Sequence, residues 1–433
     1  MRSGPLNTLL VLICALAVFK VPLFFATFGL SGAQYGGLEE SQVYVNYIVA
    51  IFVLVAVVFV FTVFRSRYMT RLEVGLYTFV LLLFVNHALW HLLDPIETEL
   101  IPRNLQLFVL FGLPGIFAAV VLSKTNNLTT FIRLVEPLAL LIGLGLILAI
   151  VVPYFTQIRV TGIGGASYQA ASYYAAFTFG LLSYFVFRAP VMHRYAFFRS
   201  SVGNLMSLTC LPLLFIATVI NGGRGAFILL TIYASIVVYW LFFSRIRSYA
   251  GAAVATFAMT AVPMLGYGLI NWLGQDAILG AGYRRAVAFI GGDGGSIINL
   301  AEGSSGRDRV YEIAWQGILD APLVGYGVFG AWDRVIHPHN LILDLWLQWG
   351  LPFGTVILGI GVYLVAKALK GSRPESAFLV ILGLYPLINL MFSGGYLSTP
   401  IFWFVLVALL LRSIEPWRLR ERVDPQVRAG ARS

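Results

Sequence analysis

The residues best suited to chemistry lie in one stretch, Gly303–Gly354, which interrupts an otherwise apolar sequence. Within it, His337 and His339 flank Pro338. Imidazole ordinarily titrates near neutral pH, so one histidine beside a substrate hydroxyl can act as a general base. A metal pair is the alternative, but two histidines without a cysteine or HExxH partner make an incomplete zinc site. We expect His339, at the entry to a helix, to act as a base, and we expect no metal and no cofactor.

Three polar residues follow the histidine pair at helical spacing. Asn340, Asp344 and Gln348 lie four residues apart and therefore share one face of a helix. Polar groups on one face of a membrane helix usually face the bundle interior or a wet cavity. Plain hydrogen bonding between helices is the alternative.

Three arginines are candidates for binding phosphate, because guanidinium groups bind phosphate oxygens in pairs. Arg224 lies in the short turn NGGRGAF, whose glycines let a ligand approach closely. Arg307 lies in the first turn of a helix predicted to begin near Ser305, and Arg159 lies in QIRVTGIGG. The simpler alternatives are a snorkelling Arg224 that marks a helix end and an Arg307 that pairs with Asp308.

The elements that position these residues are membrane helices. The chain has 433 residues, of which 59% are hydrophobic and 11% charged, whereas about a quarter of residues are charged in soluble domains. The net charge of +10 falls mainly in short connectors, where it orients a membrane protein, so we expect no nucleic-acid partner. Cys14 and Cys210 lie inside apolar runs and provide no disulfide framework.

Apolar segments long enough to cross a bilayer predict an all-α polytopic protein with about twelve spans. They cover residues 6–26, 43–64, 73–93, 104–123, 134–153, 168–187, 203–220, 225–243, 250–272, 340–367, 376–393 and 399–412.

Alternating connectors between these spans are rich in lysine and arginine, which predicts that they are cytoplasmic. Both termini are then cytoplasmic, and an even number of spans agrees with this. The long connector 273–338, with short helices, lies on the outer side. We expect a single transmembrane domain over 1–414 and a basic cytoplasmic tail over 415–433.

Three further polar residues lie near the outer ends of spans. His87 and His91 share one helix face, and we interpret them as interfacial residues. Lys20 is expected to snorkel toward the interface.

The motifs resemble those of the O-antigen ligase and Wzy-type polysaccharide polymerase superfamily. HNLILDLWLQWG is similar to that family's His-Asn, nine residues, Gly pattern, SGRD resembles the arginine of its large periplasmic loop, and NGGRGA resembles its second arginine. The twelve-span layout with a large loop between spans nine and ten is similar over essentially the whole chain. Departures are Phe353, where the family has a small residue, and the short distance from Arg307 to His339.

The resemblance implies a bundle like that of GT-C glycosyltransferases in the bacterial inner membrane, with its active site on the periplasmic side. Its members move a glycan from a polyprenyl-diphosphate lipid to an acceptor sugar without a metal. His339 would deprotonate the acceptor hydroxyl, with inversion, and Arg224 and Arg307 would neutralise the leaving diphosphate. Arg159 is a secondary diphosphate candidate and His337 a substrate-binding one. Asp344 or Asn340 would orient the imidazole.

Two acceptors compete within this family. If the acceptor is another lipid-linked repeat unit, the protein is a polymerase, and if it is a lipid A core sugar, the protein is a ligase. The motif PHNLILDLWLQWG resembles the polymerases more. A transporter or lipid flippase is the alternative of another class. Transporters usually place polar sites at the midplane between repeated halves, whereas here the polar residues concentrate in one outer loop and no repeat is visible.

Overall fold

The computed structural model describes residues 5–30, 42–66, 69–93, 103–155, 162–163, 166–221, 223–243, 307–370 and 374–413. This part of the chain is almost entirely helical, as predicted, apart from the two-residue strands β1 (Gly162–Ile163) and β2 (Ala166–Ser167), which pair antiparallel. The long helices are α1 (Pro5–Leu30), α2 (Gln42–Arg65), α3 (Arg71–Leu93), α5 (Leu113–Lys124), α6 (Leu128–Leu146), α8 (Tyr168–Phe187), α10 (Ser201–Asn221), α11 (Arg224–Val238), α14 (Arg307–Asp320), α16 (Leu341–Lys370) and α17 (Pro374–Phe392). The short elements are α4 (Arg103–Leu107), η2 (Phe108–Gly112), η3 (Ile147–Val151), α7 (Val152–Phe155), η4 (Val191–His193), α9 (Ala196–Arg199), η5 (Tyr239–Phe243), α15 (Ala331–Arg334) and η8 (Tyr396–Ser398).

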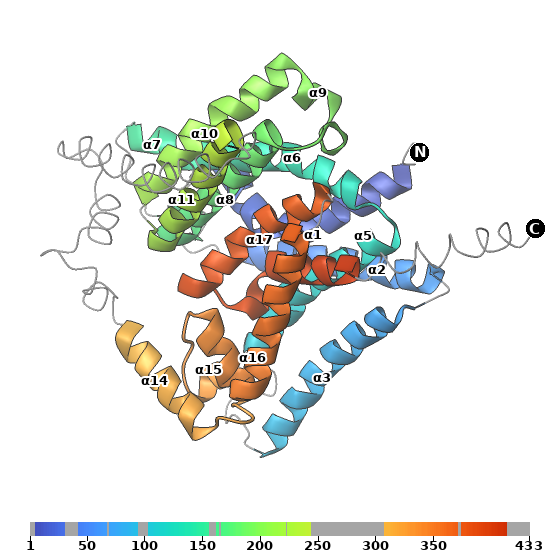
Figure 1. Cartoon of the computed structure of the whole chain (residues 1–433), viewed down its shortest axis with the longest axis vertical. Helices are drawn as coiled ribbons and strands as arrows, with labels where there is room; N and C mark the ends of the chain where they lie inside the picture. Colours follow the sequence, from blue (N-terminus) through green and yellow to red (C-terminus); the bar gives the residue numbers. More distant parts are fainter. Residues whose placement is uncertain are drawn as a thin grey trace, which may run out of the picture.

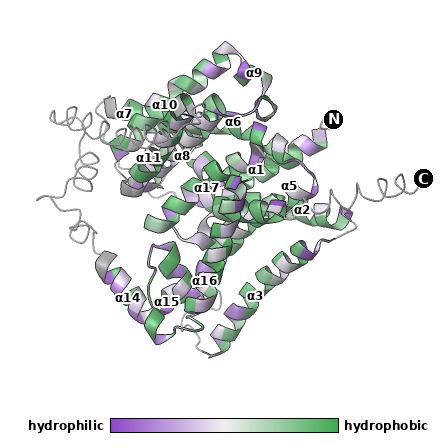
Figure 2. Ribbon diagram, viewed as in Figure 1, coloured by the Kyte–Doolittle hydropathy of each residue, from purple (hydrophilic) through white to green (hydrophobic). Residues whose placement is uncertain are grey.

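Among the described residues, nine helices are long and apolar enough to cross a membrane. Two expected spans correspond to shorter apolar helices, Gly225–Leu241 and Pro400–Ser413, and the expected span 250–272 lies outside the described residues. Large apolar side chains such as Val57, Leu81 and Val362 are exposed on α2, α3 and α16. Figure 2 shows hydrophobic residues along these helices. Lipid would cover such surfaces, so the membrane prediction is confirmed, while the total of twelve stays a prediction.

The core of the bundle forms where α1 packs against α5 and α6, and where α8 packs against α10 and α11 (Figure 1). Small residues permit this close approach: a Cβ at Gly145 would lie 2.3 Å from the carbonyl oxygen of Ala26. Stacked rings fill the centre, including Phe19 against Phe177 at 6.0 Å between centroids. The bundle thus provides a rigid frame for its polar ends.

Lys20 does not snorkel. Its side chain is fully buried, its Nζ donates a hydrogen bond to the carbonyl oxygen of Leu110, and it lies 4.5 Å from the ring centroid of Phe111. Leu110 and Phe111 belong to η2, a π-type segment whose wider hydrogen-bonding pattern is unlike that of the flanking α-helices. The lysine therefore satisfies a backbone acceptor inside the bundle, which the sequence alone did not indicate.

The expected tenth span is broken rather than continuous. α16 contains Gly350 with φ 74° and ψ 167°, a conformation that only glycine adopts easily. The last carbonyls before the break, on Leu347 and Gln348, accept hydrogen bonds from the amides of Tyr326 and Gly327. The Pro/Gly-rich turn after α14 therefore caps the first segment of α16, and the polar residues of this helix precede the break.

Candidate functional site

His339 is held in an unusual backbone conformation immediately before α16. Its φ is 52°, in the left-handed region that non-glycine residues rarely adopt. Its Nδ1 lies 3.2 Å from the carbonyl oxygen of Ser393, just after α17. In the tautomer whose Nδ1–H donates to this carbonyl, Nε2 is the basic nitrogen. The sequence prediction that the ring sits at a helix entry is confirmed, one residue before the helix cap.

Asn340 is that cap. Its Oδ1 accepts hydrogen bonds from the amides of Ile342 and Leu343, at 3.0 and 3.3 Å. Side-chain oxygens commonly satisfy the first free amides of a helix in this way. The oxygen of Asn340 therefore orients the helix, and the suggestion that Asn340 orients the imidazole stays a prediction.

The two histidines form part of a cluster of tilted aromatic rings, which we call the ring stack although its planes are not parallel. The ring centroids of His337 and His339 are 4.0 Å apart, and the ring of Trp332, from α15, lies 3.8 Å from that of His337. Burial, and then the nearby His339, lower the pKa of His337 to about 3. His337 is therefore neutral at physiological pH and supplies no positive charge for a phosphate group.

The sequence had suggested that Asp344 orients the imidazole, but its hydrogen bonds go to other side chains. Its side chain is 2% exposed, and its Oδ1 accepts hydrogen bonds from Trp332 Nε1 and, at 2.7 Å, from Gln348 Nε2. The hydroxyl of Tyr396 in turn donates to Gln348 Oε1. The predicted polar face of α16 is real for Asp344 and Gln348, which point into the protein, and Trp332 is the residue that links them to the histidines.

The start of α11, which carries Arg224, lies beside the same loop. A Cβ on Gly225 would be 3.2 Å from Cβ of Phe392, the residue before Ser393, and it would overlap the hydroxyl of Tyr173. The missing side chain of Gly225 therefore lets the first turn of α11 approach the end of α17 closely. Two predicted site residues from distant parts of the sequence, Arg224 and His339, are thus brought to one place at backbone level.

The other predicted arginines are placed less completely. α14 begins at Arg307 and packs its far half against α16, where a Cβ at Gly317 would lie 3.1 Å from Leu347. From the helical rise, Arg307 lies about 15 Å along the axis from that contact. The side chains of Arg224, Arg307 and Asp308 lie outside the described residues, as does Arg159 altogether.

A cavity of about 420 Å³ opens next to Ser393, and sequence reasoning missed it. Its lining is largely apolar and aromatic, with polar contributions from Asn389 and from Arg103. Arg103 is exposed and forms no ion pair within the part of the chain that the structure describes. Its position after an acidic connector, on the predicted outer side, runs against the topology bias, and this signal could have identified it. Apolar walls with a few polar groups are typical of ligand sites.

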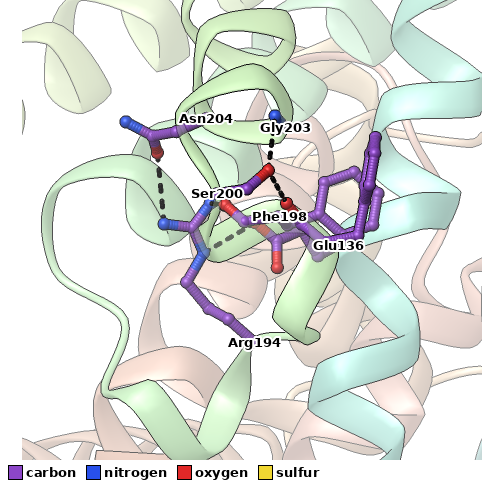
Figure 3. Close-up of polar contacts among 7 residues, drawn as sticks. Glu136, Arg194, Phe198, Ser200, Gly203 and Asn204 are labelled. Carbon is purple, nitrogen blue, oxygen red and sulfur yellow. Dashed lines mark hydrogen bonds and ion pairs between the residues drawn. The ribbon is translucent and has the colours of Figure 1, made fainter.

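A second polar cluster, drawn in Figure 3, lies beside α9, which Figure 1 places at the opposite end of the bundle from α15. The buried carboxylate of Glu136, on α6, forms an ion pair with Arg194, at 2.6 Å. Arg194 also donates to the carbonyl oxygen of Phe198 and to Asn204 Oδ1. The arginine therefore ties the connector before α10 to α6.

Comparison with protein-family models finds no match for the chain, and no curated protein matches it. Among the described residues, no group of three or more histidine, cysteine or acidic side chains is arranged to hold a metal ion.

Proposed function

We propose that the protein is a membrane glycosyltransferase that moves a glycan from a polyprenyl-diphosphate carrier to an acceptor sugar on the outer face of the bacterial inner membrane. One observation carries this proposal. Phe392 and Ser393, at the end of α17, contact both the helix start that bears Arg224 and the ring of His339. The helix start that carries the proposed cation and the proposed base therefore both lie against the end of α17.

In the proposed reaction, Nε2 of His339 accepts the proton of the acceptor hydroxyl. The hydroxyl oxygen attacks the anomeric carbon, the bond from this carbon to the diphosphate oxygen breaks, and its electron pair leaves with the diphosphate. Attack from the opposite face inverts the anomeric centre. Arg224 and Arg307 would stabilise the charge that develops on the diphosphate, with Arg159 as a further candidate. Asn340 and Asp344 act on the scaffold in this proposal.

The cavity beside Ser393 supports a lipid-linked substrate. Its apolar lining, with Tyr44 and Tyr174 among the aromatic side chains, suits part of an isoprenoid chain, and Arg103 suits an anionic headgroup. We favour a second lipid-linked glycan as the acceptor, which makes the protein an O-antigen or exopolysaccharide polymerase.

Incubation of the reconstituted protein with a polyprenyl-diphosphate oligosaccharide, alone and with lipid A core, tests this proposal. A ladder of longer glycans without core is expected, whereas a single transfer onto core would identify a ligase. The absence of any transfer would contradict the proposal. Arg307→Ala should abolish the ladder, while Arg309→Ala, which removes an exposed arginine from the same helix, should preserve it.

A further inference from the structure

We propose that Trp332 is the positioning residue of the site: its indole donates a hydrogen bond to Asp344 and fixes the neighbouring imidazoles of His337 and His339 in their reactive orientation. The inference rests on the proposed function, because the step that it tunes is proton removal by His339. It changes the role of Asp344 from a direct partner of the histidine to an anchor for the tryptophan.

Ring contacts with the indole determine where the histidines lie. The ring of Trp332 contacts that of His337 with centroids 3.8 Å apart and planes tilted by 39°, and His337 contacts His339 in the same way, at 4.0 Å and 57°. His337 Nε2 is buried and has no hydrogen-bond partner among the described residues. The orientation of His337 therefore depends on its ring contacts more than on hydrogen bonds of that nitrogen, and these contacts lead back to Trp332.

The indole also touches the segment that holds the other side of His339. A Cβ on Gly395 would lie 2.4 Å from the Cη2 atom of Trp332, so the ring lies directly against this glycine. Gly395 is two residues after Ser393, whose carbonyl oxygen is near Nδ1 of His339. Trp332 thus contacts both the stack and the loop between which the catalytic ring is held.

Hydrogen bonds fix the plane of the indole. Trp332 Nε1–H donates to Asp344 Oδ1, Gln348 also donates to this oxygen, and Tyr396 donates to Gln348. Tyr396 adjoins Gly395, so the contacts close into a ring that begins and ends at Trp332. Buried networks in which each member is satisfied are rigid, and loss of one member loosens the others.

Rigidity here has a kinetic consequence. A base displaced by about 1 Å from its productive position can cost on the order of a hundredfold in rate. Trp332→Phe retains an aromatic ring for the stack and removes the Nε1–H donor. We expect it to lower kcat at least tenfold with KM nearly unchanged, because substrate contacts are retained while the base is misplaced.

Two substitutions of Asp344 test whether the site needs its hydrogen-bond acceptor or its negative charge. Asp344→Asn keeps an oxygen that can accept from Trp332 and Gln348, and we expect kcat within about threefold of the wild type. Asp344→Leu removes the acceptor and should lower kcat as much as Trp332→Phe does. Because both act through one hydrogen bond, the Trp332→Phe/Asp344→Leu double variant should be no slower than either single variant.

The proposal is overturned if Asp344→Asn is as inactive as Asp344→Leu, since charge would then be required, or if the two losses multiply in the double variant.

A second measurement does not depend on transfer. The chain has only five histidines, so nitrogen NMR of ¹⁵N-histidine-labelled protein can follow each ring. We expect one sharp Nδ1–H tautomer for His339 in the wild type and in Asp344→Asn, and averaged or shifted signals in Trp332→Phe.

The transfer assay and the NMR measurement together distinguish the proposed function from the positioning role of Trp332. A wild type that transfers no glycan but shows the expected NMR pattern would contradict the proposed function and leave the positioning role supported. Active wild type with His339 signals unchanged in Trp332→Phe would contradict the positioning role alone.

Discussion

The two polar ends of the bundle use charge in opposite ways. In the cluster of Figure 3, Glu136 is neutralised by Arg194, and two further ion pairs, Lys124 with Glu73 and Arg412 with Glu375, lie between other helices. Around His339, by contrast, the Oδ1 of Asp344 accepts only neutral donors, an indole and an amide. An end whose charges pair with one another ties helices together. An end that fixes neutral rings, and whose acid bonds to the indole instead of to the imidazoles, can act on a ligand.

The largest difference between the ends should appear in the rate of transfer. His339→Ala removes the proposed base and should lower the rate about 10²–10⁴-fold with little change in the thermal midpoint. His193→Ala is the matched control, since it removes a buried histidine next to Arg194, whose Nδ1 contacts the hydroxyl of Tyr184. It should lower stability and leave the rate per folded protein unchanged. Equal rate losses in the two variants would remove the distinction between the ends.

The free energy of unfolding should depend more on the cluster of Figure 3 than on the residues around His339. Arg194→Ala leaves the buried carboxylate of Glu136 without its partner, which should cost about 3–5 kcal/mol of unfolding free energy. Arg412→Ala breaks a more exposed pair and should cost about 1 kcal/mol or less. Unfolding by denaturant in detergent provides the measurement. Replacing both partners, in Glu136→Leu/Arg194→Met, should recover most of the loss, and a double variant as unstable as Arg194→Ala would contradict this explanation.

Two glycines give a matched test of backbone approach at the two ends. A Cβ at Gly225 would overlap the hydroxyl of Tyr173 near the proposed site, and a Cβ at Gly203 would lie 2.3 Å from the carbonyl oxygen of Phe197, near the cluster of Figure 3. Alanine at either position should destabilise the protein by about 1–3 kcal/mol through overpacking.

Only Gly225→Ala should also lower kcat/KM for the lipid-linked donor, about tenfold, because it displaces the helix start that carries Arg224. Rates normalised to folded protein, measured over a range of donor concentrations, make this comparison. Normal kcat/KM in Gly225→Ala would show that the start of α11 does not bind the donor.

Much of the fold follows from local sequence. Apolar length located the helices closely, as in α2, Gln42–Arg65, expected at 43–64. The break at Gly350 was not predicted, because its stability comes from amides of Tyr326 and Gly327, more than twenty residues earlier in the chain. Lys20 was misplaced for the same reason, since its acceptor is on a distant helix. Hydropathy indicates whether a segment lies in lipid or in water, but it does not indicate which distant groups form hydrogen bonds with its backbone.

For the site, residue types were more informative than spacing. His339 and Asp344 were singled out by their chemistry, but the direct partnership that the family resemblance implied for them is replaced in the structure by contacts through Trp332. A tryptophan near a membrane boundary ordinarily indicates an interfacial anchor, so its sequence carried no signal for this role. The approach of both the start of α11 and the ring of His339 to the end of α17 could not be inferred from either motif.

The smallest expected effect concerns pH. The pKa of His337 is lowered by burial from its ordinary value of 6.5 to about 3, so below about pH 6.5 the unfolded chain binds a proton that the folded protein does not. Stability contributed by neutral His337 is therefore complete above pH 6.5 and decreases as pH falls toward 3. Burial also lowers the pKa of His193, near the cluster of Figure 3, so this residue acts in the same direction.

Thermal midpoints measured in detergent from about pH 7 to pH 5 should fall for the wild type, and fall less for His337→Asn, which cannot be protonated. The corresponding His193→Asn variant should flatten the curve as well, because desolvation acts on both rings regardless of whether their cluster pairs its charges. If His337→Asn lost stability on acidification as steeply as the wild type, His337 would not be held neutral by the fold. The stack that joins Trp332 to His339 would then contain a ring that can become charged.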